Sequence, residues 1–126
     1  MMRNAKGFTV IEVLVAVTVM AIALTGIAAM SVSTISTDTL GRHTNAATAL
    51  AQAKLEELRI LRRSDPDWDE GTHTETGLNE DGSSGGGLYD REWVIDENYN
   101  GLNNLSRVVV TVSWLDGQVS LASLYW

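Results

Sequence analysis

The feature that most constrains this chain is a long apolar stretch near its start, from Phe8 to Met30. About 23 predominantly apolar residues form a helix long enough to cross the hydrocarbon core of a bilayer. One carboxylate, Glu12, lies about a turn inside this stretch. A charge within a membrane helix is costly unless it is paired, so the position of Glu12 indicates a function rather than a simple anchor.

The residues before the apolar stretch form a short basic leader, which contains Arg3 and Lys6 and ends at Gly7. The run Lys6-Gly7-Phe8-Thr-Val-Ile-Glu12 resembles the signature of the type IV pilin superfamily. The resemblance implies that a prepilin peptidase removes residues 1–7 by cutting between Gly7 and Phe8. It also implies that the new N-terminal residue, Phe8, becomes N-methylated and that residues 8–30 stay in the mature protein.

Glu12 would be the fifth residue of the mature chain, where the family has its assembly glutamate. In a filament, the Glu12 carboxylate can pair with the α-amino group of Phe8 on a neighbouring subunit. Such pairing offsets the desolvation of both charges and sets the register between helices, which is the best-attested use of a buried ion pair.

Two simpler interpretations of the apolar stretch stay open at this point. An ordinary secretory signal peptide would use Ala21-Ile22-Ala23 as its cleavage site, but its apolar core would be shorter and would lack Glu12. A plain single-span anchor explains the length but neither the Gly7-Phe8 junction nor Glu12. All three interpretations keep the basic N-terminal end in the cytoplasm. The pilin resemblance therefore predicts a single-pass protein of the bacterial inner membrane, with a periplasmic C-terminal domain that later enters a pilus or pseudopilus.

Length and charge limit the remainder of the chain. Of the 126 residues, residues 31–126 are left for one small exported domain. The formal charge is −7, and it becomes −9 if Arg3 and Lys6 leave with the leader. An acidic domain repels nucleic acid phosphates, so we expect no dedicated nucleic-acid binding. The chain has no Cys, which excludes the disulfide loop found in many major pilins.

A second helical pattern covers residues 42–63 and is amphipathic. Its apolar residues recur every three or four positions and form one stripe, which consists of Ala46, Ala47, Leu50, Ala51, Leu55, Leu58 and Leu61. Residues 50–58 resemble the corresponding helix of minor pilins and of the I-type pseudopilin of type II secretion. The resemblance implies one long helix that runs from the apolar stretch through the Ser- and Thr-rich residues 31–41. Arg59, Arg62 and Arg63 would then form a basic helix end in solvent.

Residues 64–87 are expected to form a solvated acidic loop with a Gly-rich tip. Asp65, Asp67 and Asp69 stand at alternate positions, as the ligands of a calcium loop do. The match to an EF-hand is incomplete, because that motif requires Gly where Glu70 stands and Glu where Thr76 stands. Calcium at the three aspartates is therefore one hypothesis beside a plain solvated loop, and no other cofactor or metal is expected.

The last third of the chain carries strand patterns. The alternation of Tyr89, Trp93 and Ile95 predicts a strand over residues 89–95, and Val108, Val110, Val112 and Trp114 predict one face of a strand over residues 107–115. Asp116-Gly117 signals a hairpin to a returning strand over residues 118–126, with Tyr125 and Trp126 packed. The predicted fold is α+β and pilin-like, with a long helix on an antiparallel sheet of about three strands; its last two strands resemble the V-type minor pilins.

No nucleophile–base pair, paired histidine ligands or phosphate loop is evident, so we expect a substrate of prepilin peptidase rather than an enzyme. The first functional hypothesis is a minor type IV pilin that helps to initiate or modify pilus assembly. The alternatives are an I-type pseudopilin of type II secretion, and a filament-borne adhesin or DNA-uptake subunit that recognises its target through the loop at residues 65–87. The implied partners are other pilin or pseudopilin subunits through the N-terminal helix, prepilin peptidase, the inner-membrane assembly platform and the membrane itself.

Overall fold

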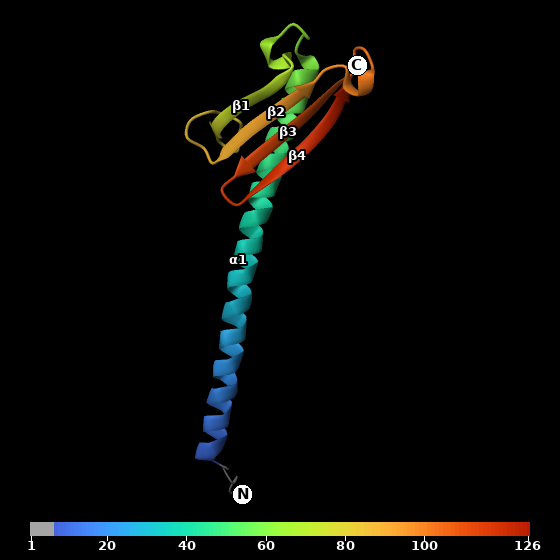
Figure 1. Cartoon of the computed structure of the whole chain (residues 1–126). Coiled ribbons are helices and arrows are strands. Elements are labelled where there is room, and N and C mark those ends of the chain that lie inside the picture. The colour runs from blue at the N-terminus through green and yellow to red at the C-terminus, as the bar shows by residue number, and fades with distance from the viewer. Residues whose placement is uncertain (1–6) are drawn as a thin grey trace, which may run out of the picture. The chain divides into compact units, whose positions relative to one another are not determined.

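The computed structural model describes residues 7–126, which form one long helix and one antiparallel sheet (Figure 1). Apart from Gly7, the proposed leader lies outside the described residues. The chain divides into two units, with the boundary between Thr39 and Leu40. The helix α1, Val10–Ile60, contributes to both units.

The N-terminal unit consists of the first part of α1, whose large apolar side chains are more than half exposed from Phe8 to Ile35. A helix that is apolar on all sides needs an apolar environment, either lipid or other helices. Within residues 7–126, α1 is also the one helix with the length and composition to cross a membrane. The sequence prediction of a membrane-capable helix is consistent with this geometry.

The helix continues without a break through the Ser- and Thr-rich segment, as the sequence predicted. Five hydroxyl groups in this segment donate to backbone carbonyls four residues earlier, for example from Ser31 to Ile27 at 3.0 Å and from Thr37 to Ser33 at 3.0 Å. This bonding satisfies side chains that would otherwise compete with the helix for backbone groups. Gly26 and Gly41 are both helical, so neither ends α1.

In the C-terminal unit, the rest of α1 buries the predicted stripe against the sheet, with Ala47, Leu50, Ala51 and Leu58 at its centre. The helix ends at Ile60, three residues before the predicted end at Arg63. A turn between Arg62 and Asp65 replaces the last helical residues, and it leads into the short helix η1, Pro66–Trp68. Pro66 lacks a backbone N–H and has a fixed φ, so it suits the start of a new turn rather than the continuation of α1.

The sheet has four strands in the order β1-β2-β3-β4, and every neighbouring pair is antiparallel. Its strands are β1 (Gly71–Leu78), β2 (Tyr89–Asp96), β3 (Ser106–Trp114) and β4 (Gly117–Tyr125). The prediction of an α+β fold with a long helix on an antiparallel sheet is confirmed, and the sheet has four strands where about three were expected. The fourth strand, β1, lies inside the stretch that we expected to be a loop. The sequence pattern did not indicate a strand there, because the half-buried side chains of β1 include the polar His73 and Glu75. A short second helix, η2 (Tyr99–Gly101), lies between β2 and β3.

The core of the C-terminal unit follows the predicted alternation on β2 and β3. Val108, Val110 and Val112 are fully buried, and Trp93 faces Val110 in the register between the two strands. The β3–β4 turn consists of Leu115 and Asp116, one residue earlier than the predicted Asp116-Gly117 turn. Gly117 instead pairs with Trp114, and a Cβ at this glycine would lie 2.6 Å from the indole ring. Glycine therefore makes room for the tryptophan rather than forming the turn.

The two C-terminal aromatic residues have different environments. The Tyr125 hydroxyl donates to the carbonyl of Leu55 at 2.7 Å, and its ring meets Trp68 edge to face at 5.2 Å between centroids. The expectation of packing is confirmed for Tyr125, but it is wrong for Trp126, which is 83% exposed. Successive side chains of an extended chain point to opposite faces, so the residue after an inward-facing Tyr125 points outward.

Candidate functional site

The three residues that the sequence singled out, Gly7, Phe8 and Glu12, lie just before α1 or in its first turn. Gly7, Phe8 and Thr9 precede the helix without regular secondary structure, and Gly7 and Phe8 are exposed. Thr9 closes the first turn: its carbonyl accepts from the N–H groups of Glu12 at 3.1 Å and Val13 at 3.2 Å. The Gly7–Phe8 bond therefore lies in exposed, non-helical backbone, which is the kind of segment that peptidases cut.

Glu12 lies in the first turn of α1, where a negative charge interacts favourably with the helix dipole. Its backbone N–H donates to the Thr9 hydroxyl at 3.3 Å. Thr9 and Glu12 have the spacing of a capping box, in which a Thr caps the helix and a Glu stands three residues later. The capping-box spacing is visible in the sequence, but no role for Thr9 was predicted from it. No ion pair of Glu12 exists within residues 7–126, so the assembly role of its carboxylate stays a prediction.

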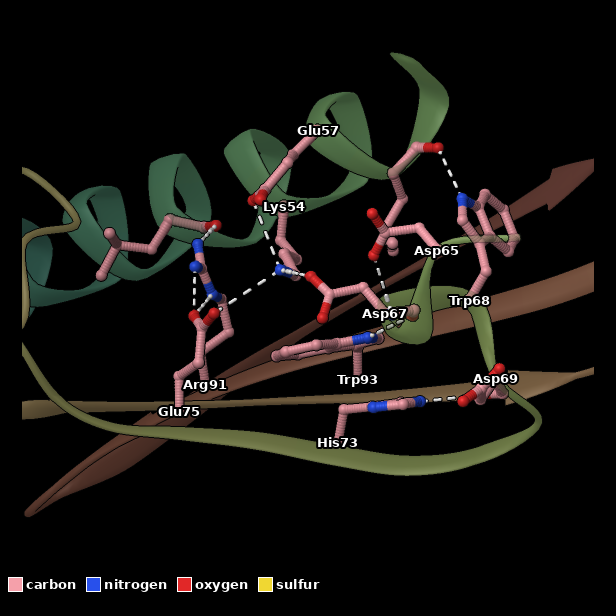
Figure 2. Close-up of polar contacts among 12 residues, drawn as sticks. Lys54, Glu57, Asp65, Asp67, Trp68, Asp69, His73, Glu75, Arg91 and Trp93 are labelled. Carbon is pink, nitrogen blue, oxygen red and sulfur yellow. Dashed lines mark hydrogen bonds and ion pairs between the residues drawn. The ribbon is translucent and has the colours of Figure 1, made fainter. Parts of the chain in front are cut away.

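A second cluster of polar side chains lies between α1, β1 and β2 in the C-terminal unit (Figure 2). Its centre is Lys54, whose side chain is 1% exposed. The Lys54 ammonium lies 2.7 Å from Asp67 and 3.5 Å from Glu75, and also 3.3 Å from Glu57. It lies 4.0 Å from the centroid of the Trp93 ring, which adds a cation–π contact.

A second buried cation, Arg91 of β2, extends this cluster. Its Nε donates to Glu75 at 2.9 Å, its Nη2 donates to the same oxygen, and its Nη1 donates to the backbone carbonyl of Leu50 at 3.1 Å. The carboxylate of Glu75 thus bridges Lys54 and Arg91 (Figure 2). We refer to Lys54, Asp67, Glu75 and Arg91 as the ion network. It ties β1 and η1 to α1 through charge-assisted hydrogen bonds.

The ion network keeps Lys54 charged. Burial lowers the pKa of Lys54, but the hydrogen bond to Asp67 and the charges of Glu75, Glu57 and Asp67 outweigh it and raise the pKa above its usual 10.5. A lysine that acts as a base needs the opposite shift. The arrangement therefore has the properties of a structural clamp, in which two buried cations are neutralised by carboxylates.

The three calcium candidates have separate roles. Asp65 accepts the backbone N–H of Asp67 at 3.1 Å and thereby caps η1. Asp67 binds Lys54, and the backbone carbonyl of Asp69 accepts from the His73 ring at 2.8 Å. In the described part of the chain, no three acidic or histidine side chains are grouped so that they could hold a metal ion. Calcium at these residues stays an untested prediction.

The ion network was not predicted from the sequence, although part of its signal is present there. Lys54 stands four residues from both Leu50 and Leu58, so it falls within the apolar stripe of the helix. A lysine at such a position is buried only if it finds a partner. Glu57 is a partner on the same helix, but Asp67 and Glu75 come from η1 and β1, and no local pattern connects those segments to α1.

Residues 2–28 match a family model described as the prokaryotic N-terminal methylation motif. The match includes Gly7, Phe8 and Glu12 together with the first turns of α1, and it covers about a fifth of the chain. Comparison with curated proteins found no match. Comparison with solved structures likewise found none. The chain thus carries the N-terminal methylation motif of type IV prepilin-like proteins, and the motif precedes a pilin-like α+β layout of one long helix and a four-stranded antiparallel sheet.

Proposed function

We propose that this protein is a minor type IV pilin, a structural subunit that helps to initiate or modify a pilus. The methylation motif over residues 2–28 supports this proposal most directly, because it marks a type IV pilin-like substrate of prepilin peptidase. In the proposed sequence of events, the peptidase cuts the exposed Gly7–Phe8 bond and Phe8 is methylated. The mature subunit then enters a filament through α1.

The exposed apolar surface of the N-terminal unit supports assembly through α1. Before assembly, lipid would cover side chains such as Val10, Leu14 and Ile22, all of which are exposed. In a filament, the same surface would pack against the helices of other subunits. Glu12 would pair with the Phe8 amine of a neighbour, which would make one register between subunits more stable than the others.

The proposed location is the inner membrane, with residues 8–30 as the membrane half of α1 and residues 31–126 as a periplasmic domain. The division into units at Thr39 and Leu40 and the absence of Cys from the whole chain are compatible with such a domain. The C-terminal unit is held together by its apolar core and the ion network, and it needs no disulfide. The role is structural, as it is in the pilins that carry this motif.

The test is mass spectrometry of the protein from sheared filaments and from membranes, with the main filament subunit as the calibrant. A methylated Phe8 at the N-terminus, at a few copies per filament, is the expected result. Methylated protein in membranes but never in filaments would instead assign it to the pseudopilins of type II secretion. An N-terminus between Ile22 and Leu24 would overturn the pilin assignment, because it would show cleavage by a signal peptidase.

Two variants separate processing from assembly. Gly7→Leu should leave the leader attached, since it changes the residue on which cleavage depends. Glu12→Gln should still be cleaved after Gly7 but should be depleted from filaments, because it removes the negative charge that would pair with the neighbouring amine. Asp38→Asn is the matched control: Asp38 is another exposed carboxylate on α1, and its loss should leave filament incorporation unchanged.

A further inference from the structure

An open groove of about 470 Å³ lies beside the carboxyl end of β4. Figure 1 shows the C-terminal end of the chain next to the loop that joins β2 and β3. The groove, named here the Trp126 groove, is lined by Arg63, Glu97, Asn98, Asn104, Ser106 and Trp126. No role assigned above to the N-terminal helix or the ion network involves these six residues.

Trp126 is the exceptional residue of this groove. Trp68 and Trp93 are almost fully buried, whereas most of the Trp126 indole is in water. An exposed indole offers a large, flat apolar surface together with one N–H donor. Single exposed apolar residues are common, so the indole becomes informative only through its neighbours.

The other side chains of the groove are polar, and several are held in place. The Arg63 guanidinium donates to the Ser106 hydroxyl at 2.6 Å and stacks 4.2 Å from the centroid of the Trp68 ring. The Asn98 side chain accepts the backbone N–H of Asn104 at 3.4 Å, and both residues have a left-handed backbone. These contacts hold the loop and the arginine before any ligand arrives, which lowers the entropic cost of binding.

The chemistry of the groove excludes several classes of ligand. Arg63 and Glu97 carry opposite charges, so the groove favours neither sign, and the acidic chain disfavours polyanions. A purely apolar ligand would cover Arg63, Glu97 and two Asn amides without satisfying them, which is unfavourable. The best match is a neutral molecule that has one apolar face and a rim of hydroxyl groups.

We propose that the Trp126 groove binds a neutral hexopyranose unit of a glycan. The C–H face of a pyranose ring stacks on the Trp126 indole. Its hydroxyls both donate and accept, so they pair with the Arg63 guanidinium, the Glu97 carboxylate and the amides of Asn98 and Asn104. This inference goes beyond a structural role in a filament, and it places recognition outside the 65–87 loop.

Saturation-transfer NMR on the purified full-length protein tests the proposal. The detergent must be zwitterionic, because sugar-based detergents would compete for the groove. The probes are the methyl glycosides of mannose, galactose and glucose, with methyl glucuronide as the anionic comparison. At least one neutral glycoside should bind saturably with a Kd of about 1 mM to 10 mM and more tightly than the glucuronide, and acrylamide quenching of tryptophan fluorescence should fall as it binds.

Variants locate the binding site. Trp126→Ala should weaken binding by about tenfold or more, whereas Trp126→Phe, which keeps an aromatic face, should weaken it only a few-fold. Leu115→Ala is the control, because Leu115 is 94% exposed in the β3–β4 turn at the other end of β4. Thermal unfolding should be the same for all three variants, since the replaced side chains are largely in water.

Three results would overturn the proposal: no saturable binding of any neutral glycoside below about 50 mM, tighter binding of the glucuronide, or unchanged affinity in Trp126→Ala. The assay uses purified protein and does not depend on filament assembly. A failure here would therefore leave the minor pilin proposal standing, and a failure of that proposal would leave this one standing.

Discussion

Replacing Lys54 with Met removes the central charge of the ion network while keeping an unbranched side chain at the same place on α1. The ammonium contacts Asp67, Glu57 and Glu75 within 3.5 Å, and its side chain is 1% exposed. The Met side chain can keep the contact with Trp93 through its sulfur. The variant therefore isolates the loss of the charge from the loss of packing.

The expected loss of stability is about 3 kcal/mol. Removing one member of a buried ion pair typically costs about 3–5 kcal/mol, because the partner is left without compensation. Here the side chains of Asp67 and Glu75 are 35% exposed, so water recovers part of their solvation. Arg91 also continues to neutralise Glu75. Both effects place the cost at the lower end of the range.

The assay is urea unfolding of the full-length protein in detergent, followed by tryptophan fluorescence. Trp68 and Trp93 are buried in the C-terminal unit, so their emission reports its unfolding. If the same unit is unfolded by heat instead, a loss of about 3 kcal/mol corresponds to a fall in Tm of roughly 12–24 °C. Arg59→Met is the control, because the exposed Arg59–Glu56 pair at 3.7 Å should contribute less than about 0.5 kcal/mol.

A Lys54→Met protein as stable as the original, or more stable, would refute this reasoning. Replacing buried ions with apolar side chains is sometimes neutral or favourable when all the charges are removed. The double variant Lys54→Met/Asp67→Asn tests the coupling directly. It should lose less than the sum of the two single variants, since each single change already breaks the same contact.

Three further predictions concern glycines and pH. Gly87→Ala should strongly destabilise the C-terminal unit, because a Cβ there would overlap the Leu78 carbonyl; a melting curve like that of the original protein would contradict this steric argument. Gly41→Ala, in open space on α1, should instead stabilise the unit by about 0.5–1 kcal/mol in urea unfolding, and a loss of stability would show that this position needs glycine. Burial raises the pKa values of Tyr89 and Tyr125 above their usual 10.0, and the buried lysine of the ion network also has a raised pKa. These groups stabilise the fold fully below about pH 10, and their contribution is lost as the pH rises through the folded-state pKa values. The free energy of unfolding should therefore be level near pH 9 and fall above pH 10. A free energy of unfolding that rises above pH 10 would contradict the predicted sign.

The long helix and the central strands could be predicted from the sequence because their signals are local. The apolar composition of residues 8–30 and the alternation of Val108, Val110 and Val112 depend only on nearby positions. β1 could not be found in this way, since Glu75 faces inward and is satisfied by Arg91, which lies on another strand. The hydrophobic pattern measures apolar burial, and it does not detect a strand whose inner face is neutralised by ions.

The predicted processing site and the exposed tryptophan show the same contrast. Gly7, Phe8 and Glu12 lie within one short stretch of sequence, so they can be recognised as a motif without knowledge of the fold. The Trp126 groove joins residues from the turn after α1, the β2–β3 loop, the start of β3 and the segment that follows β4, which come together only after folding. Trp126 was expected to be packed because aromatic residues are usually buried. This expectation was wrong because it did not consider which face of the extended chain Trp126 occupies.

The hydrogen bond between Tyr125 and Leu55 links residues that are 70 positions apart, and it has a consequence for the order of folding. The sheet is a meander of neighbouring strands, so each hairpin can form from contacts that are close in sequence. The contact at Leu55 requires β4, which follows the other three strands along the chain. During synthesis the helix near Leu55 therefore stays uncovered until β4 emerges, although β2 and β3 can already cover the centre of the stripe. Closure of this part of the core is a late step with a large loop-closure entropy.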